Sequence, residues 1–477
     1  MAAWRILTLI ICGAIAPAIG SPRSDPTTGR AVFTGAATPH ASSLSLNPAA
    51  LGLGPGVRLE VYFAFTSTLQ QLGIERRSLD ITTGDFTTTP RVSDTQLAPG
   101  GAFSLVGHPS DSLTLGFEAR IPPAELFPRN HDELRYHTLG ESQRNYLATA
   151  GVSFRVTSAF YFGASVTHEN TYLRLRYARD TALDAGFGAG GVTSDCGGAP
   201  CGVENPEATE IYDVNVSTPL LKGSNLKVNL GTVFRVYPDV WIGLAYHTPP
   251  GFDIQSSLDG TLDVTRAPRD GGEVLHGGST VYVSYPASID GEVRARLPRE
   301  LELHVGGRWE DLSRMQALDV RAYGSTFRNA GIPEWMLRTR GLHDSFALWA
   351  GVEQIDRGGR YRLGARVGFE TSALSAERTS ALTIAPPKAT IDLGGQLRLG
   401  SLLVQLSYGI ALSPTVVVGD DDTAFDPRFG LDCYDSGFDY TSRGCEAART
   451  GYALPSAAGE YSRLDHAVRL GFRYALP

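Results

Sequence analysis

The feature that most constrains this chain is a two-residue alternation of apolar and polar side chains. In residues 464–476 the even positions are mostly apolar or aromatic, and the odd positions are small or charged. Successive side chains of a β-strand point to opposite sides, so this segment predicts a strand with one apolar face and one polar face. The same alternation recurs in residues 111–121, 361–370 and 388–399.

The lengths of strands and connections distinguish a transmembrane barrel from a soluble β-sandwich or propeller, which also alternates. Most candidate strands have ten or more residues, whereas soluble strands usually have about five or six. Tight turns such as 356–359 alternate with long connections such as 178–210 and 412–461. Short turns at one rim and long loops at the other are typical of outer-membrane barrels, which face lipid outside and water inside. We therefore expect an all-β, antiparallel transmembrane barrel.

The number of strands follows less directly from the pattern. The candidate segments number fifteen, whereas barrels of this kind have an even number of strands. Either residues 74–82 belong to a loop hairpin or one strand boundary is misplaced.

Residues 1–20 have the features of an export signal. Arg5 provides the positive charge, residues 6–19 are apolar, and Ala18-Ile19-Gly20 is a small-x-small cleavage site. The apolar stretch is too short to span a bilayer as a helix. We expect residues 1–20 to be a signal peptide and the mature chain to begin at Ser21.

The net charge excludes one class of partner. With Arg5 removed, 41 basic residues oppose 50 acidic ones, so the net charge of the mature chain is 41 − 50 = −9. Nucleic-acid-binding proteins usually carry a basic face, so we expect no nucleic-acid partner.

Four cysteines remain in the mature chain: Cys196, Cys201, Cys433 and Cys445. An even number in an exported chain indicates disulfides. Local pairing, Cys196 with Cys201 and Cys433 with Cys445, is the simplest of three connectivities. No Cys-x-x-Cys spacing or neighbouring histidine supports a metal site. We therefore expect neither a metal nor another cofactor.

Residues 21–56 lack the alternation, and small and polar residues dominate them. Such a segment can be neither a lipid-facing strand nor an independent domain. We expect a plug inside the barrel or a disordered tail, with the barrel itself formed by residues 57–477. If the plug is buried, its backbone polar groups must be hydrogen-bonded.

Several short motifs occur in a defined order along the mature chain. They are Gly29-Arg30-Ala31, Asn47-Pro48-Ala49, Trp241-Ile242-Gly243-Leu244-Ala245-Tyr246, Gly341-Leu342-His343-Asp344, Pro386-Pro387 before Ile391-Asp392-Leu393-Gly394, and Phe472-Arg473-Tyr474-Ala475. Together they resemble the FadL family of outer-membrane long-chain fatty acid transporters. Two positions depart from the family pattern, because Leu342 replaces an aromatic residue and Leu476-Pro477 replaces a terminal aromatic residue.

The resemblance implies a monomeric barrel of about 14 strands with an N-terminal hatch in the lumen. In that family a hydrophobic ligand is captured near the outer surface and passes to an inner site. It then leaves laterally into the membrane, because a kink in the third strand opens the wall. The implied function is passive transport of hydrophobic small molecules, triggered by hatch movement and without a cofactor. Long-chain fatty acids are the first expectation, and the sequence does not separate them from hydrocarbons.

The resemblance also implies two structural motifs. Asn47, Pro48 and Ala49 form the hatch motif, although alone they read as an ordinary Asx-Pro turn. Pro99, Gly100 and Gly101 open the candidate third strand. Proline removes a ladder donor and glycine permits a bulge, so these residues are either the wall kink or the turn before the strand.

The head-group cations are the remaining implied site. Arginine suits a ligand carboxylate because its guanidinium binds both oxygens. The family resemblance places one cation at Arg338 and a second at Arg174, Arg176 or Arg179. The alternative for each is a solvated lumen or loop arginine.

Other functions find little support in the sequence. No Gly-x-Ser-x-Gly or Gly-x-x-x-x-Gly-Lys-Ser/Thr motif is present, and His131 and His137 are too far apart for the helical zinc spacing. We expect no enzyme activity. The alternatives are an outer-membrane barrel enzyme of the lipase or protease type, and a structural or adhesive barrel with disulfide-bonded surface loops.

Overall fold

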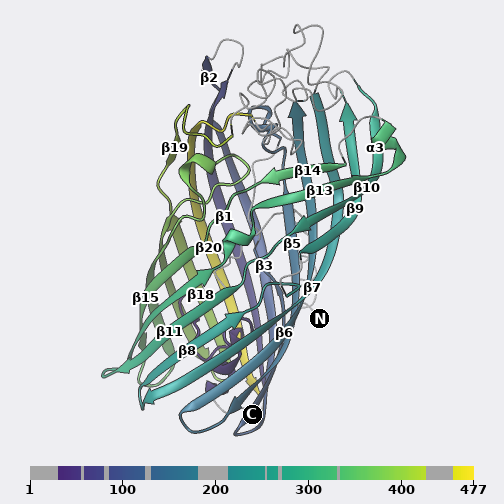
Figure 1. Ribbon diagram of the computed structural model, residues 1–477. Coiled ribbons are helices and arrows are strands. Elements are labelled where there is room, and N and C mark those ends of the chain that lie inside the picture. Colours follow the sequence, from purple (N-terminus) through teal and green to yellow (C-terminus); the bar gives the residue numbers. More distant parts are fainter. Residues whose placement is uncertain are drawn as a thin grey trace, which may run out of the picture.

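The computed structural model describes residues 31–54, 59–79, 85–123, 130–180, 213–252, 255–266, 271–329, 334–425 and 455–476. Figure 1 shows a tall, tilted barrel whose C-terminus lies at the lower rim. In the described part of the chain, no helix is long and apolar enough to cross a membrane. Residues 1–20 and the four mature-chain cysteines, Cys196, Cys201, Cys433 and Cys445, lie outside the described residues.

Fourteen strands close the barrel. Each pairs antiparallel with the next, and the last returns to the first with Leu476 opposite Leu59. In order around the wall they are β1 (Leu59–Leu79), β3 (Val92–Ser110), β4 (Leu113–Ile121), β5 (Ser142–Arg155), β6 (Phe160–Asp180), β7 (Asp213–Tyr237), β8 (Val240–His247), β11 (Ser288–Leu297), β12 (Leu301–Glu310), β15 (Ser345–Ile355), β16 (Tyr361–Glu370), β17 (Lys388–Leu399), β18 (Leu402–Leu412) and β20 (Gly459–Leu476). The predicted 14-stranded antiparallel barrel is confirmed.

The surplus fifteenth segment came from a misplaced boundary. β1 is one strand of 21 residues that contains most of residues 74–82. Polar Gln70 and Gln71 interrupt its apolar pattern but not its hydrogen-bonded ladder.

A second, smaller sheet extends part of the wall beyond the barrel. Four successive barrel strands are interrupted before their outer parts, and these four parts follow the outer part of β7 in the order β9, β10, β13 and β14. We call β9, β10, β13 and β14 the outer sheet. Its strands are β9 (Ser256–Arg266), β10 (Val274–Val283), β13 (Ala317–Tyr323) and β14 (Trp335–Thr339). The other elements are β2 (Phe86–Thr88), β19 (Val416–Val418), α2 (Ser43–Leu46), α3 (Ser325–Asn329), and the 3-10 turns η1 (Pro48–Leu53), η2 (Asp132–Leu134), η7 (Leu312–Arg314) and η8 (Ala376–Arg378).

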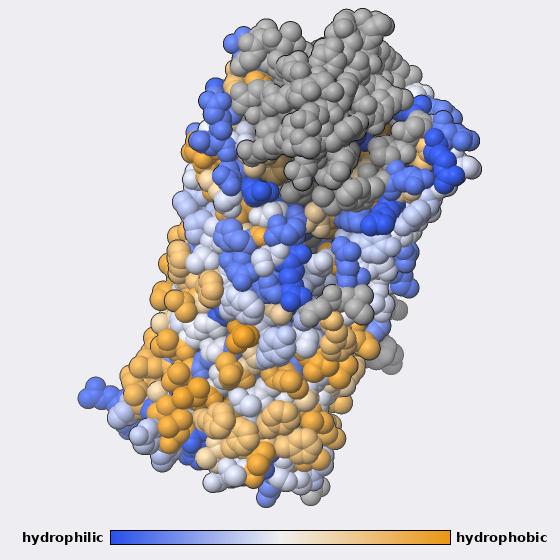
Figure 2. Space-filling model, in the orientation of Figure 1, coloured by the Kyte–Doolittle hydropathy of each residue, from blue (hydrophilic) through white to orange (hydrophobic). Residues whose placement is uncertain are grey.

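The lower part of the barrel carries an outward apolar belt. Large apolar side chains such as Phe65, Leu348 and Leu406 are more than half exposed. Figure 2 shows the belt as an orange zone below a bluer upper region. Exposed apolar side chains around a closed barrel indicate contact with lipid, so the chain is built for a bacterial outer membrane.

Inside the belt, part of the wall is charged. Asp290, Arg308 and Glu310 are buried on neighbouring strands, and Arg308 lies 3.4 Å from Asp290 and 2.8 Å from Glu310. Buried charges are costly unless they are paired, so such networks take the place of the water that would solvate them. This part of the lower lumen is therefore polar.

Strand β6 shows how this arrangement reverses toward the outer end. At the level of the belt, Phe162 and Val166 are exposed while Ser165 and Thr167 are buried. Nearer the outer end of β6, Arg174 and Arg176 are exposed while Leu173, Leu175 and Tyr177 are buried. The strand keeps the same parity throughout, so its inner face changes from polar to apolar as it leaves the belt.

Candidate functional site

The segment 31–54 lies inside the lower lumen, and we call it the plug. Nearly all of its side chains are buried. On one side, the Phe33 amide donates to Glu353 (3.0 Å), Arg366 donates to the Thr34 carbonyl (2.8 Å) and the Thr38 hydroxyl donates to Glu292 (2.8 Å). Charged groups of the wall thus satisfy backbone groups of a segment with little regular structure, as burial requires.

The Asn47-Pro48-Ala49 motif fixes another part of the plug. The Asn47 amide nitrogen donates to the carbonyls of Ala36 (2.6 Å) and Thr232 (3.0 Å), and its oxygen accepts from the Ala49 amide (3.1 Å). Asn47 therefore begins the η1 turn and ties the plug both to itself and to β7. Gly231 gives the Asn47 side chain room, because a Cβ there would overlap it.

Three side chains of the charged wall could in principle hold a metal ion. Donor atoms of Glu302, His304 and Glu353 lie within 4.8 Å of one another and are buried. The Arg362 guanidinium forms ion pairs with both carboxylates, and the plug amide of Phe33 uses one oxygen of Glu353. A cation already lies between the carboxylates, so we interpret this cluster as an ion-pair network that holds the plug.

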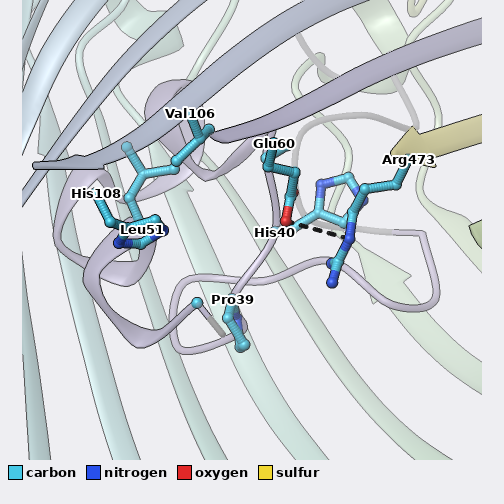
Figure 3. A pocket seen from close by; sticks show the side chains of 9 residues that line it. Pro39, His40, Leu51, Glu60, Val106, His108 and Arg473 are labelled. Carbon is cyan, nitrogen blue, oxygen red and sulfur yellow. Dashed lines mark ion pairs between the residues drawn. The ribbon is translucent and has the colours of Figure 1, made fainter. Parts of the chain in front are cut away.

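A small pocket opens where the plug meets the lower rim. Figure 3 shows Pro39, His40 and Leu51 of the plug facing Glu60 and the other wall residues drawn. The ion pair between Arg473 and Glu60, 3.3 Å apart, crosses one side of it. The pocket is small and its charges are paired, so it is a poor candidate for a hydrophobic ligand.

The strongest candidate for binding a hydrophobic ligand is an apolar cluster at the outer end. It covers the buried face of the outer parts of β6 and β7, of the outer sheet and of α3. Its members are Leu173, Leu175, Tyr177, Val214, Val216, Leu221, Leu258, Leu262, Val264, Leu275, Val281, Val283, Tyr285, Leu318, Val320, Ala322, Phe327 and Met336. We call this set the outer apolar cluster. Sequence reasoning missed it, although the reversal of polarity along β6 is visible in the sequence.

Arg338 lies at the edge of the outer apolar cluster. It is opposite Leu318 in the sheet, and its guanidinium stacks 4.1 Å from the centre of the Tyr177 ring. Its side chain is completely buried, forms an ion pair with Glu141 and donates to the His137 carbonyl. The predicted head-group arginine therefore lies beside the apolar cluster, but it already has a carboxylate partner from this chain.

The structure separates the three candidates for the second cation. Arg179 is buried on the same face of β6 as Tyr177, whereas Arg174 and Arg176 are exposed on the opposite face. Arg174 donates to the Pro219 carbonyl (2.8 Å), and Arg176 donates to the Asn130 side chain (3.3 Å). Of the three, only Arg179 faces the side on which the apolar cluster lies.

In the described part of the chain, the ladder of the wall is interrupted above β4. The last pair between β3 and β4 joins Gly101 to Ile121, and the last pair between β4 and β5 joins Arg120 to Leu147. Beyond these pairs, β3 and β5 continue, and no described strand lies between them. We call this place the wall gap. The outward side chains of Leu97, Ile121 and Tyr146 are exposed at its border.

The kink candidates Pro99, Gly100 and Gly101 border the wall gap. They lie in β3, the second barrel strand, and all three pair in register with β1. The third barrel strand is β4, which ends at Ile121 before Pro122 and Pro123. A Cβ on Gly100 would lie 2.7 Å from the ring of Pro123. Proline has no backbone N–H to donate to a β-ladder, so Pro122 and Pro123 explain why β4 ends at Ile121.

The segment 130–141, between β4 and β5, lies against the strands around the wall gap, and we call it the gate segment. The Leu139 amide donates to the Arg176 carbonyl (2.7 Å), and the Ala178 amide donates to the Arg135 carbonyl (2.8 Å). Arg76 of β1 donates to the Glu133 carbonyl (2.9 Å). The segment thus links β6 to β1, and sequence reasoning left it as an irregular connection.

His137 is the buried titratable group at the centre of the gate segment. Burial lowers its pKa well below the usual range, and the nearby positive charges of Arg76 and Arg338 lower it further. Its ring nitrogen lies 3.3 Å from the Ser456 carbonyl. The neutral form of His137 is therefore the one that fits this environment.

Comparisons with known proteins support the barrel architecture. No protein-family model and no curated protein sequence matches the chain. Solved structures do. A crystal structure of a Pseudomonas aeruginosa FadL homologue matches 97% of this chain and 100% of its own, with a TM-score of 0.72 and 14% identity.

Two toluene transporters also match. The Pseudomonas putida toluene transporter TodX gives a TM-score of 0.61 and 14% identity, covering 96% of this chain and 98% of its own. The Ralstonia pickettii toluene transporter TbuX gives a TM-score of 0.58 and 15% identity, covering 94% and 98%. At such identities the likeness concerns the fold alone. By its fold, this chain is an outer-membrane β-barrel of the FadL and TodX type.

Proposed function

We propose that this protein is a passive outer-membrane transporter of hydrophobic small molecules, with long-chain fatty acids as the first candidate ligands. The observation that carries the proposal is the reversal of polarity along β6, which continues across the outer sheet. Apolar side chains on the inner face, outside the membrane belt, attract a molecule that water excludes.

The lower lumen directs such a molecule away from the straight path. Below the outer apolar cluster the wall carries buried ion pairs such as Arg308 with Glu310, and the plug occupies the centre. An apolar ligand that entered this region would have to displace the plug and would disturb paired charges. The route we propose therefore turns sideways through the wall gap, whose apolar border residues Leu97, Ile121 and Tyr146 adjoin lipid.

Two ligand classes are candidates: the family resemblance of the sequence implies fatty acids, and the toluene transporters of similar fold are named for an aromatic hydrocarbon. A cation at the edge of an apolar site, such as Arg338, favours a ligand with one carboxylate and a long tail. Hydrocarbons are the second candidate, because Glu141 already neutralises Arg338 and an uncharged ligand leaves that pair intact.

The test is uptake of a labelled long-chain fatty acid and of a labelled aromatic hydrocarbon by cells that produce the protein. The informative variant replaces Pro122 with Thr and Pro123 with Val, which restores two ladder donors and lets β4 extend beside β3. We expect uptake to fall to the level of cells without the protein. The matched control makes the same changes at Pro249 and Pro250, which follow β8 away from the wall gap.

Two results would contradict the proposal. One is that the wild-type protein raises uptake of neither compound. The other is that the β4 variant assembles normally in the membrane and transports as well as its control, which would refute the lateral route.

A further inference from the structure

Glu141 is a carboxylate that the chain supplies to its own candidate head-group arginine. Arg338 and Glu141 are both buried completely or nearly so, and they form an ion pair. Arg340 also approaches Glu141, at 3.8 Å. Two guanidinium groups thus converge on one carboxylate beside the outer apolar cluster. This is the arrangement that a fatty acid head group would need.

Glu141 also belongs to the gate segment. It is the last residue before β5, whose first residue, Ser142, is opposite Arg174 of β6. The same guanidinium that holds the Glu141 carboxylate also donates to the His137 carbonyl. Arg338 therefore fixes two points of the gate segment to β14, whereas Arg76 fixes a third point, the Glu133 carbonyl, to β1.

We propose that Glu141 is an internal competitor of the ligand, and that a ligand carboxylate opens the wall gap by displacing it from Arg338. The ligand class is a monocarboxylic acid with a long apolar tail. This inference rests on the proposed function, because it requires that such a ligand reach the outer apolar cluster.

The exchange follows from the cost of burying a lone charge. A ligand carboxylate replaces Glu141 like for like, so Arg338 stays paired. The displaced Glu141 loses its closer partner and keeps only Arg340, 3.8 Å away, so its burial becomes costly, because a poorly paired buried charge costs several kcal/mol. It moves toward water and carries the end of the gate segment away from β14. An uncharged hydrocarbon does not compete for Arg338 and leaves the segment where it is.

Linkage makes the proposal measurable. If the ligand acid loosens the gate segment, then loosening the segment must strengthen binding of the acid by the same factor. Glu141→Gln removes the competing charge but leaves an oxygen that can accept from Arg338. We expect it to tighten binding of a long-chain acid about tenfold, and to leave binding of the methyl ester of that acid unchanged.

The binding experiment uses the full-length protein in detergent and titrates a long-chain fatty acid or its methyl ester. Glu334→Gln is the matched control, because Glu334 lies just before β14 in an exposed pair with Arg328. Equal affinities of the Glu141→Gln variant and the wild type for the acid would overturn the proposal. An equal change for acid and ester would also overturn it. If the wild type binds neither compound, the transport function itself fails.

A second experiment needs no variant. Hydrogen exchange of the wild-type gate segment is followed with and without each ligand, and the amides of Leu139 and Ala178 report on its attachment to β6. We expect the acid to speed exchange in residues 130–141 and the ester to leave it unchanged. Unchanged exchange when the acid is demonstrably bound would refute the coupling while leaving the transport proposal intact.

Discussion

Gly231 of β7 lies directly beneath Asn47 of the plug, so that any side chain at position 231 would overlap the Asn47 amide group. The next strand contributes to the same surface, because Gly163 of β6 is opposite Gly231 and lies under Pro48 and Ala49. At these two positions the barrel wall has no side chain, and the plug motif packs directly against its backbone. The contact between Asn47 and β7 therefore depends on position 231 being glycine.

Gly231→Ala should loosen the plug without unfolding the barrel. The added methyl group pushes Asn47 off the Thr232 carbonyl, while the ladders of β7 stay intact. We expect higher ion conductance in planar bilayers. Gly291→Ala is the control, since its nearest atom beyond its chain neighbours would be a Leu244 methyl carbon at 3.9 Å, an ordinary contact. Equal conductance of the two variants would show that the plug does not depend on this contact.

Asn47→Ala should weaken the same region by a different route. It removes the hydrogen bonds to the carbonyls of Ala36 and Thr232. Leaving buried groups unpaired costs about 1–3 kcal/mol locally. Hydrogen exchange in residues 31–54 should accelerate while exchange in the barrel strands stays slow. Asn170→Ala, a change of the same kind on the partly exposed side of β6, should leave plug exchange unaltered. Faster exchange throughout the barrel would contradict a local role.

Arg338→Ala should destabilise the outer end of the molecule more than removal of both ion-pair partners does. The single change removes the closer partner of the buried Glu141 carboxylate and leaves only Arg340, 3.8 Å away, at a cost of up to about 3–5 kcal/mol. Adding Glu141→Ala removes that charge. Limited proteolysis between residues 122 and 142 should be fastest in the single variant and slower in the double variant. Additive effects would mean that the two side chains are not coupled.

The attachment of the gate segment should weaken in acid through His137. Its folded-state pKa is lowered by burial and by Arg76 and Arg338, whereas the unfolded value is about 6.5. Stability is therefore complete above pH about 6.5 and falls as the pH decreases toward the folded-state pKa. Exchange in residues 130–141, corrected for intrinsic rates, should become faster as the pH is lowered from about 7.5 to about 5.5. These pH values lie about one unit above and below the unfolded-state pKa of His137. His137→Gln should lose this dependence, and an unchanged pH profile would exclude His137 as its source.

The disulfide pairing of the surface cysteines remains a prediction of the sequence. We expect Cys196 to pair with Cys201, and Cys433 with Cys445. Mass mapping of peptides from non-reduced protein checks both pairs. Cross-linked peptides that join one of the first two cysteines to one of the last two would refute local pairing, as would free thiols.

The barrel was predictable because every second residue of a membrane-spanning strand faces lipid and is therefore apolar. The alternation in residues 464–476 identified the outward face of β20 correctly, since Asp465 and Arg469 are buried while Val468 and Tyr474 are exposed. The same logic misleads beyond the belt, where water replaces lipid outside. There Tyr177 faces inward although it is aromatic, so alternation alone could not choose among the three arginines of β6.

The gate segment was harder to foresee for a different reason. Its position depends on long-range contacts, such as those of Arg338 with Glu141 and of Arg76 with Glu133, and no local pattern encodes these contacts. Pro122 and Pro123 were the one visible signal, because adjacent prolines cannot continue a ladder.

The plug and its charged surroundings have a consequence for the cell. An outer membrane excludes toxic solutes only if each barrel in it stays sealed to water-borne molecules. Wall carboxylates and guanidiniums hold the plug at Phe33, Thr34 and Thr38, so the proposed lateral route for hydrophobic ligands would be separate from the path of water-soluble molecules. A bacterium could then place more copies of this protein in its outer membrane to take up scarce hydrophobic nutrients. It would not become more sensitive to hydrophilic antibiotics by doing so.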